Sequence, residues 1–217
     1  MARTLEPELM DNAPAADLVE NLRDLSRINR WLGGNRTLAG LLDPYLRRNP
    51  RALILDVGAA NGETVRWLEA RYPEARMVSM DRAERMLRMG TGARVAADVF
   101  AWPVRPASVD IVICSLFLHH FDDDGVRRIL GHFEDAAREA VIAVDLHRHP
   151  LARGFLPATR FAARWHPVTV HDGVISVEAA FTPDELRLLM PRARVRSHWP
   201  WFRLSLEINV RAFSVLL

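Results

Sequence analysis

The chain has 217 residues, of which 49% are hydrophobic and 26% charged, with a formal net charge of +2. This length and composition are sufficient for one soluble globular domain with a sizeable core. The single cysteine, Cys114, excludes an internal disulfide and a zinc site built from several cysteines. All 29 residues of the lysine and arginine total are arginines, which also excludes Schiff-base chemistry and a phosphate-binding loop with lysine.

Neither a membrane segment nor a nucleic-acid partner is expected. No stretch approaches the roughly 18 uninterrupted apolar residues of a membrane span, and residues 1–10 contain two glutamates where a signal peptide has its apolar region. We therefore expect a cytoplasmic protein. The pI of 9.3 is compatible with nucleic-acid binding, but the arginines are scattered, which favours ordinary solvated helix faces.

The segment from Asp11 to about Arg48 has a helical pattern. Leucine and isoleucine recur at spacings of three and four residues from Leu18 to Leu32, and Gly33-Gly34 ends this helix. A second, shorter helix is expected from Thr37 to Leu46. We expect one domain for residues 1–217, in which residues 1–48 form a helical lid on a core made of residues 49–217.

After Pro50, short apolar runs alternate with helical segments, which predicts a parallel sheet covered on both faces. Near the end, Thr182-Pro183 begins a capped helix, and two alternating runs joined only by Trp199-Pro200-Trp201 must pair antiparallel. The predicted fold is α/β, a Rossmann-like doubly wound sheet, mostly parallel with an antiparallel C-terminal strand. The expected strands are 52–57, 76–80, 93–97, 109–115, 140–146, 193–198 and 202–210, and the expected helices of this core are 63–71, 83–89, 122–138 and 183–190.

The loop "DVGAANG" follows the first strand, where open parallel sheets bind their ligands. Gly58 and Gly62 allow the backbone to approach a ligand closely, and the next helix offers free N–H groups. The spacing G-x-x-x-G differs from the G-x-G-x-x-G of nicotinamide sites, and Asp56 suits a cationic amino-acid group better than a pyrophosphate. A simple glycine turn explains this loop equally well when it is taken alone.

Two further acids follow the next strands of the predicted sheet. Asp81 closes the second strand, where its carboxylate can accept hydrogen bonds from both hydroxyls of a ribose. Asp98 ends the third strand, where its carboxylate and the N–H of Val99 can bracket the edge of an adenine. Acids at three successive strand ends favour a ligand site over a turn.

With these motifs the chain resembles the class I S-adenosylmethionine-dependent methyltransferases, in particular the ubiquinone/menaquinone-biosynthesis-like, small-molecule branch. The resemblance rests on "LDVGAANGE", "VSMDRAERML", "AADVFAWPVRPASVDIVICSLFLHHF" and the antiparallel ending. It implies S-adenosyl-L-methionine as cofactor and S-adenosyl-L-homocysteine as product. The family usually has a glycine at the position of Ala60, whose methyl group is tolerated only at a negative φ. The cofactor contacts that the resemblance implies are Asp56, Gly58, Ala59, Gly62, Asp81, Arg82, Asp98, Val99 and Ser115.

Methyl transfer from a sulfonium requires alignment and exclusion of water, and an oxygen nucleophile also needs a proton acceptor. His119 and His120, after the fourth strand, are the candidates, although capping of the strand end explains either of them equally well. His171 beside Asp172 is a weaker candidate, because "HDG" is also typical of a turn. No metal is expected.

The segments "VDLHRHPLARGF" and "HDGVISVEAAFTPDEL" resemble a subgroup from polyketide and quinone-type pathways. We therefore predict methyl transfer to a small acceptor of secondary metabolism, a phenol or a quinone-like molecule, at oxygen in preference to carbon or nitrogen. A rival hypothesis is a nucleic-acid methyltransferase, for which the fourth strand lacks the Asp/Asn-Pro-Pro-aromatic motif. Two further hypotheses are a nicotinamide-binding oxidoreductase and a cofactor-binding module without catalysis. The oligomeric state is not predicted.

Overall fold

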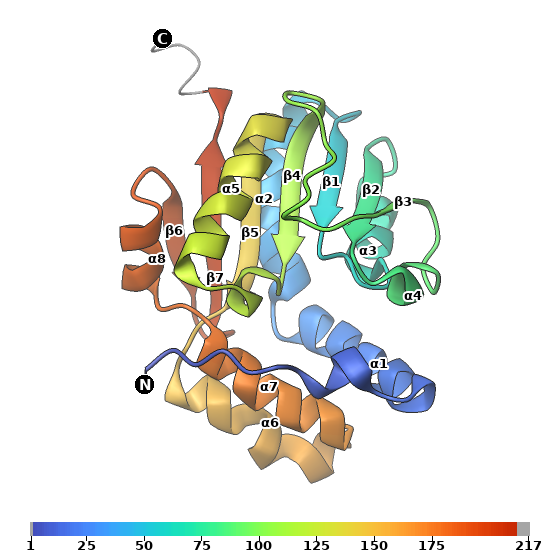
Figure 1. Ribbon diagram of the computed structural model, residues 1–217, viewed down its shortest axis with the longest axis vertical. Helices are drawn as coiled ribbons and strands as arrows, with labels where there is room; N and C mark the ends of the chain where they lie inside the picture. The colour runs from blue at the N-terminus through green and yellow to red at the C-terminus, as the bar shows by residue number, and fades with distance from the viewer. Residues whose placement is uncertain (1, 212–217) are drawn as a thin grey trace.

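The computed structural model describes residues 2–211, and its centre is a seven-stranded sheet (Figure 1). The strand order is β3-β2-β1-β4-β5-β7-β6, with β1 to β5 parallel and β7 antiparallel to both of its neighbours. The predicted Rossmann-like α/β fold with an antiparallel C-terminal strand is confirmed. The strands are β1 (Leu53–Val57), β2 (Arg76–Asp81), β3 (Ala93–Ala96), β4 (Val109–Ser115), β5 (Ala137–Leu146), β6 (Arg194–His198) and β7 (Arg203–Asn209).

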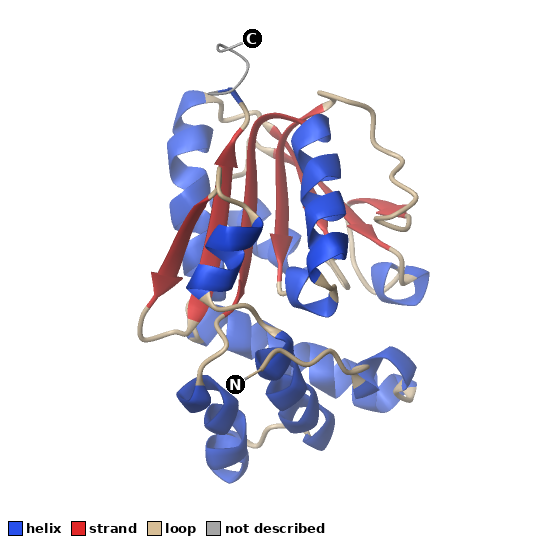
Figure 2. Ribbon diagram, turned by 60° about the vertical axis from the view of Figure 1, so that its left-hand side comes forward, coloured by secondary structure: helices blue, strands red, loops and turns tan. Residues whose placement is uncertain are grey.

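Helices cover both faces of the sheet (Figure 2). On one face, Ile54 and Ile111 are buried in a core shared with α2 and α3. On the other face, Val112, Cys114 and Val141 are buried in a core shared with α5 and α8. Strands buried on both sides consist of nearly continuous apolar residues, and the sequence located them for this reason. The helices are η1 (Leu9–Asn12), α1 (Ala15–Trp31), α2 (Gly34–Arg48), α3 (Glu63–Arg71), α4 (Glu84–Leu87), η2 (Leu118–His120), α5 (Asp123–Ala136), α6 (Pro150–Ala163), α7 (Pro167–Ala179) and α8 (Pro183–Leu189).

A cap lies over the carboxyl ends of the parallel strands (Figure 1). It consists of residues 2–31 and 150–179, and within it α7 contacts η1, α1 and α6. The second N-terminal helix, α2, packs against the sheet instead, so only part of the first 48 residues lies over the strand ends. Over residues 2–211, none of the helices combines the length and the apolar character that crossing a bilayer requires.

The sequence pattern did not reveal α6 and α7, and the interpretation of His171-Asp172 as a turn is wrong. Both residues lie inside α7, which begins with a proline at its first position. The Asp172 carboxylate is buried and accepts the N–H groups of Leu9 at 2.9 Å and Met10 at 3.0 Å. This carboxylate therefore ties the N-terminal part of the cap to α7.

Candidate active site

A cavity of about 790 Å³ lies between the carboxyl ends of the parallel strands and the cap. Its walls come from the loops after β1, β2, β3 and β4, from the N-terminal segment, and from α1, α7 and the residues before β7. Cavities that hold small ligands usually have volumes of about 300–1,000 Å³. This cavity is therefore large enough for a nucleoside-containing cofactor together with a small acceptor.

The glycine loop after β1 forms one wall of the cavity. Gly58 has a φ of 72° and Gly62 a φ of 70°, in the left-handed region that glycine adopts without steric cost. A Cβ at Gly58 would lie 2.2 Å from a carbon of the Phe117 ring, so a larger residue does not fit there. Gly62 is the N-cap residue of α3, which places the free N–H groups of that helix beside the loop.

Ala60 contradicts the expectation of a negative φ at this position. Its φ is 47°, in the left-handed region, where a Cβ crowds the following carbonyl oxygen at a cost of about 1–2 kcal/mol. Its N–H donates to Asp81 Oδ2 at 2.8 Å, and this bond holds the strained residue in place. The loop thus keeps the conformation of a glycine loop even though one of its residues is alanine.

Asp81 fixes the ends of two loops at once. Its Oδ2 accepts the N–H of Ala60, and its Oδ1 accepts the N–H of Ala83 at 2.8 Å. Each carboxylate oxygen retains a lone pair, so the group can still accept bonds from two hydroxyls on the cavity side. Asp98 is arranged in a similar way, because its Oδ1 accepts the N–H of Phe100 at 2.8 Å while the residue lines the cavity.

The structure brings most of the predicted cofactor residues to one cavity. Asp56 does not line it: its carboxyl is buried below the loop, and burial together with the charge of Asp81 raises its pKa to about 8. Gly62 acts as the N-cap of α3 without lining the cavity. The predicted residues that do line it are Gly58, Ala59, Asp81, Arg82, Asp98, Val99, Ser115, His119 and His120.

His119 forms a buried ion pair with Asp145 at the end of β5. Its Nδ1 lies 2.7 Å from Asp145 Oδ1, and its backbone N–H donates to Asp145 Oδ2 at 3.1 Å. Burial alone lowers the pKa of an imidazole, but the charge of Asp145, the hydrogen bond to it and the ion pair with Glu8 outweigh burial and raise the pKa of His119 to about 9. His119 is therefore a cation at neutral pH.

His120 has the opposite protonation state. Its ring centroid lies 4.2 Å from that of His119, and the side chain opens into the cavity. The low polarity of the enclosing walls and the positive charge of His119 lower the pKa of His120 to about 4. A neutral imidazole at neutral pH can accept a proton, so His120 is the one of the pair that can act as a base.

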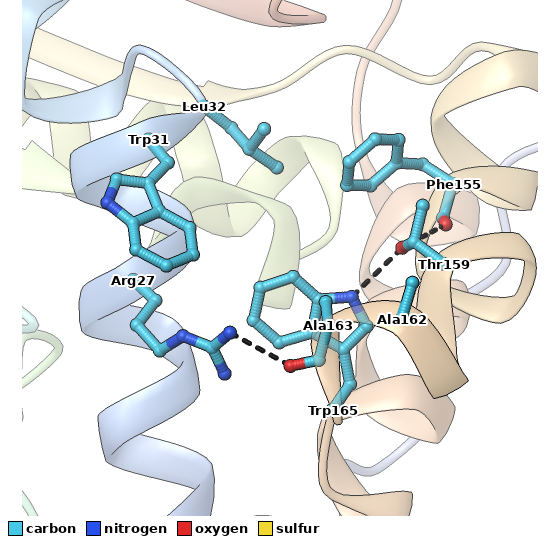
Figure 3. A pocket seen from close by; sticks show the side chains of 8 residues that line it. All are labelled: Arg27, Trp31, Leu32, Phe155, Thr159, Ala162, Ala163 and Trp165. Carbon is cyan, nitrogen blue, oxygen red and sulfur yellow. Dashed lines mark hydrogen bonds between the residues drawn. The ribbon is translucent and has the colours of Figure 1, made fainter.

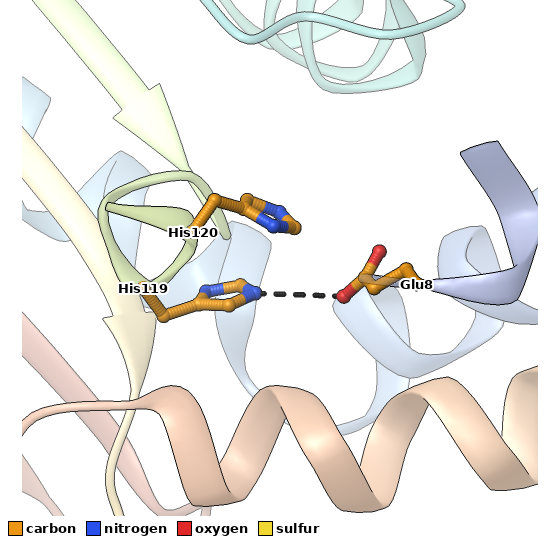
Figure 4. Close-up of side chains that lie close together, drawn as sticks. All are labelled: Glu8, His119 and His120. Atoms are coloured by element: carbon orange, nitrogen blue, oxygen red, sulfur yellow. Dashed lines mark ion pairs between the residues drawn. The ribbon is translucent and has the colours of Figure 1, made fainter. Parts of the chain in front are cut away.

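Glu8 completes this group from the N-terminal segment (Figure 4). Its Oε1 lies 3.8 Å from His119 Nε2, and Ser176 Oγ donates to the same oxygen. Ligand atoms of Glu8, His119 and His120 lie within 4.8 Å of one another, a spacing that could hold a metal ion. A protonated His119 has no free lone pair at Nε2, however, so ion pairing already accounts for the arrangement.

His171, the third predicted histidine, is not part of this group. Its side chain is half exposed and is not among the residues that line the cavity. Sequence reasoning missed Glu8 and Asp145. The position of Asp145 at a strand end is the same signal that pointed to Asp81, whereas no local pattern indicates that Glu8 folds back onto the site.

A second pocket, of about 310 Å³, opens between α1 and α6 (Figure 3). The guanidinium of Arg27 lies over the rings of Trp31 and Trp165, with its carbon 5.0 Å and 4.3 Å from their centroids. Leu32 and Phe155 line both this pocket and the large cavity. The smaller pocket therefore borders the large cavity on its apolar side.

We expect Ala60→Gly to raise the free energy of unfolding by about 1 kcal/mol, because glycine removes the left-handed strain at a φ of 47°. Ala59→Gly is the matched control: Ala59 has no positive φ, so glycine there adds only unfolded-state entropy and should destabilise. Urea denaturation of the three proteins measures both effects. Equal changes in the free energy of unfolding of the two variants would show that Ala60 carries no backbone strain.

The ion pair of His119 makes stability depend on pH. Since the folded state raises the pKa of His119 from 6.5 to about 9, the stabilisation is complete below pH 6.5 and is lost as pH rises through 9. The loss is at most about 3 kcal/mol. The measurement is the free energy of unfolding between pH 6 and 10, for the wild type and for His119→Gln. Asp56 titrates in both proteins, and His120 titrates in the variant near the acidic end of this range. The difference between the two curves as pH rises through 9 therefore reports His119, and parallel curves there would refute the assignment.

Comparison with known proteins agrees with this fold and this loop. Residues 54–140 match the family model of a methyltransferase domain. A malonyl-[acyl-carrier protein] O-methyltransferase from Xylella fastidiosa (strain M23) is 33% identical over 105 residues, which are 45% of this chain and 35% of that protein. The chain thus spans about a third of the length of this curated relative.

Solved structures extend the likeness to most of the chain. The plantazolicin methyltransferase BpumL, in complex with a triazolic desmethylPZN analog and SAH, has a TM-score of 0.69 at 12% identity over 92% of both chains. Magnesium protoporphyrin IX methyltransferase (ChlM) from Synechocystis PCC 6803, with bound SAM, has a TM-score of 0.54 at 15% identity over 82% of this chain and 79% of that one. These identities show the fold alone. Residues 54–140 thus match a methyltransferase domain, and the chain shares the fold of these solved methyltransferases.

Proposed function

We propose that this protein transfers the methyl group of S-adenosyl-L-methionine to a hydroxyl oxygen of a small, flat acceptor of the phenol or quinone-like class, and releases S-adenosyl-L-homocysteine. One observation carries the proposal. A single cavity is lined on one side by the glycine loop with Asp81 and Asp98, and on the other by the neutral imidazole of His120.

The residues present fit the cofactor. Gly58 leaves a surface without a side chain, the free N–H groups of α3 lie beside the loop, and Asp81 keeps lone pairs for the ribose hydroxyls. Asp98 and Val99 line the part of the cavity where an adenine edge would lie. When bound there, the cofactor supplies a methyl group that is already activated. The chain's own residues need only orient the acceptor and accept its hydroxyl proton.

The two histidines have different roles in removing that proton. His120 is neutral and faces the cavity, so it can accept the hydroxyl proton of the acceptor. His119 is a cation held by Asp145 and Glu8, and its charge stabilises the oxyanion that results. Exclusion of water from the cavity by the bound ligands would strengthen both effects.

The rest of the wall suits an aromatic acceptor. Large apolar side chains outnumber charged ones on the cap side of the cavity, and flat rings pack well against such surfaces. The relative from Xylella fastidiosa is described as an O-methyltransferase, which supports oxygen as the methylated atom. The apolar residues on the cap side include Leu25, Phe155 and Leu156, and Phe117, Phe121 and Trp201 line the cavity from outside the cap.

Cofactor binding is the first test. Isothermal titration should show binding of S-adenosyl-L-homocysteine and none of NAD. Asp81→Asn should weaken that binding about 10- to 100-fold, because it removes charge-assisted bonds to the ribose. Asp184→Asn, an exposed change in α8, is the control and should bind like the wild type. Tight NAD binding, or no response to either methyltransferase ligand, would refute the proposal.

Turnover is the second test. With labelled S-adenosyl-L-methionine and a panel of phenols, hydroxyquinones and RNA, we expect methylation of a phenol or hydroxyquinone. His120→Ala should lower turnover by about 100-fold or more without changing cofactor affinity. His119→Gln should raise the pKa of His120, measured by NMR, because the neighbouring positive charge is lost. If both variants retain full turnover at every pH, neither histidine handles the proton.

A further inference from the structure

Arg203, the first residue of β7, is an arginine in a place where arginine is rarely found. The residue is 1% exposed and is among the largest fully buried side chains of the described chain. A buried guanidinium is costly unless an anion pairs with it, and arginines are almost never fully buried without one. The burial of Arg203 therefore implies an anion that pairs with its guanidinium.

No carboxylate of residues 2–211 forms an ion pair with Arg203. Its Nε donates to the carbonyl oxygen of Leu32 at 3.3 Å, and its Nη2 donates to Asn29 Oδ1 at 3.5 Å. Both acceptors are neutral and both bonds are long. Nη1 is buried and has no hydrogen-bond partner among the described residues. The guanidinium is thus left without a directly paired anion, and burial lowers its pKa to about 10 even though the charge of Asp145 acts on it from beyond ion-pair distance.

Arg203 lies in the wall of the large cavity, together with Asn29 and Leu32. In the register between β5 and β7 it stands opposite Leu146, which follows Asp145, the partner of His119. Adjacent strands are about 4.7–4.9 Å apart, so the backbone of Arg203 lies at the same end of the sheet as Asp145 and the histidine pair. An acceptor that reaches His120 therefore occupies the same cavity whose wall includes Arg203.

We propose that Arg203 binds a carboxylate of the acceptor, so that the natural acceptor is an acidic aromatic molecule carrying both a carboxylate and a hydroxyl. The proposal rests on the proposed function and narrows its substrate class. The planar guanidinium fork matches the two oxygens of a carboxylate, with Nη1 free and Nη2 only weakly engaged. Carboxylate binding supplies the missing anion and orients the ring toward His120.

The test compares aromatic carboxylates with their neutral amides on the full chain saturated with S-adenosyl-L-homocysteine. The probes are 2-hydroxybenzoate, 4-hydroxybenzoate and 2-naphthoate, each paired with the corresponding amide, in isothermal titration. Charge-assisted bonds to a buried guanidinium should make at least one carboxylate bind about 10- to 100-fold more tightly than its amide. If no carboxylate binds more tightly than its amide, including the case in which none binds, the proposal is overturned.

Variants separate binding from a purely structural role. Arg203→Gln should abolish the preference, and Arg203→Lys should retain part of it, since it keeps the charge without the fork. Arg138→Gln, which removes a half-exposed arginine paired with Asp110 outside the cavity, is the control and should keep the preference. A preference that survives in folded Arg203→Gln also overturns the proposal. If Arg203→Gln does not fold, the wild-type comparison decides alone.

The two proposals fail in different ways. Binding of S-adenosyl-L-homocysteine without any preference for carboxylates would leave the methyltransferase function standing and remove only the acidic acceptor. Absence of S-adenosyl-L-homocysteine binding would refute the proposed function, and the inference about Arg203 with it.

Discussion

The buried pair of His119 and Asp145 is the interaction on which the rest of the site depends. Asp145 holds both the ring and the backbone N–H of His119, so it fixes the turn after β4 to the end of β5. Burial and the charge that Asp145 stabilises on His119 together lower the pKa of His120, and the same charge pairs with Glu8 from the N-terminal segment. One carboxylate at a strand end thereby determines the geometry of a loop and the protonation of two imidazoles.

The chain places charges of both signs around one apolar cavity. Asp81 and Asp98 lie on the side of the glycine loop, whereas His119 and Arg203 lie toward β5 and β7. This distribution of charge would favour a cationic cofactor near the acids and a negatively charged acceptor near the cations. Methyl transfer from a sulfonium to an oxyanion requires this arrangement. The electrostatics thus support the proposed order of cofactor and acceptor along the cavity.

The sheet could be predicted from the sequence because its strands are buried on both faces and flanked by glycine, proline or acids. α7 could not, because it carries apolar and β-branched residues all around and contains the turn-like "HDG". The acids Asp81 and Asp98 were found by their position at strand ends. Glu8 and Arg203 were not. Glu8 reaches the site through tertiary contacts of the N-terminal segment with α7, such as those of Asp172 with Leu9 and Met10. Arg203 is one arginine in a strand, and the sequence pattern alone cannot assign it to a cavity.

The burial of Cys114 in β4 has a practical consequence for studies of the cap. Its thiol is enclosed in the core of the sheet, and burial raises its pKa well above the ordinary value, so maleimide reagents have little thiolate to attack. The sequence contains no other cysteine and no lysine. A single cysteine introduced at an exposed cap position, such as Leu151→Cys, can therefore carry a fluorophore or spin label without removal of a native thiol. Spectroscopy on such a labelled protein would follow the cap in solution as ligands bind.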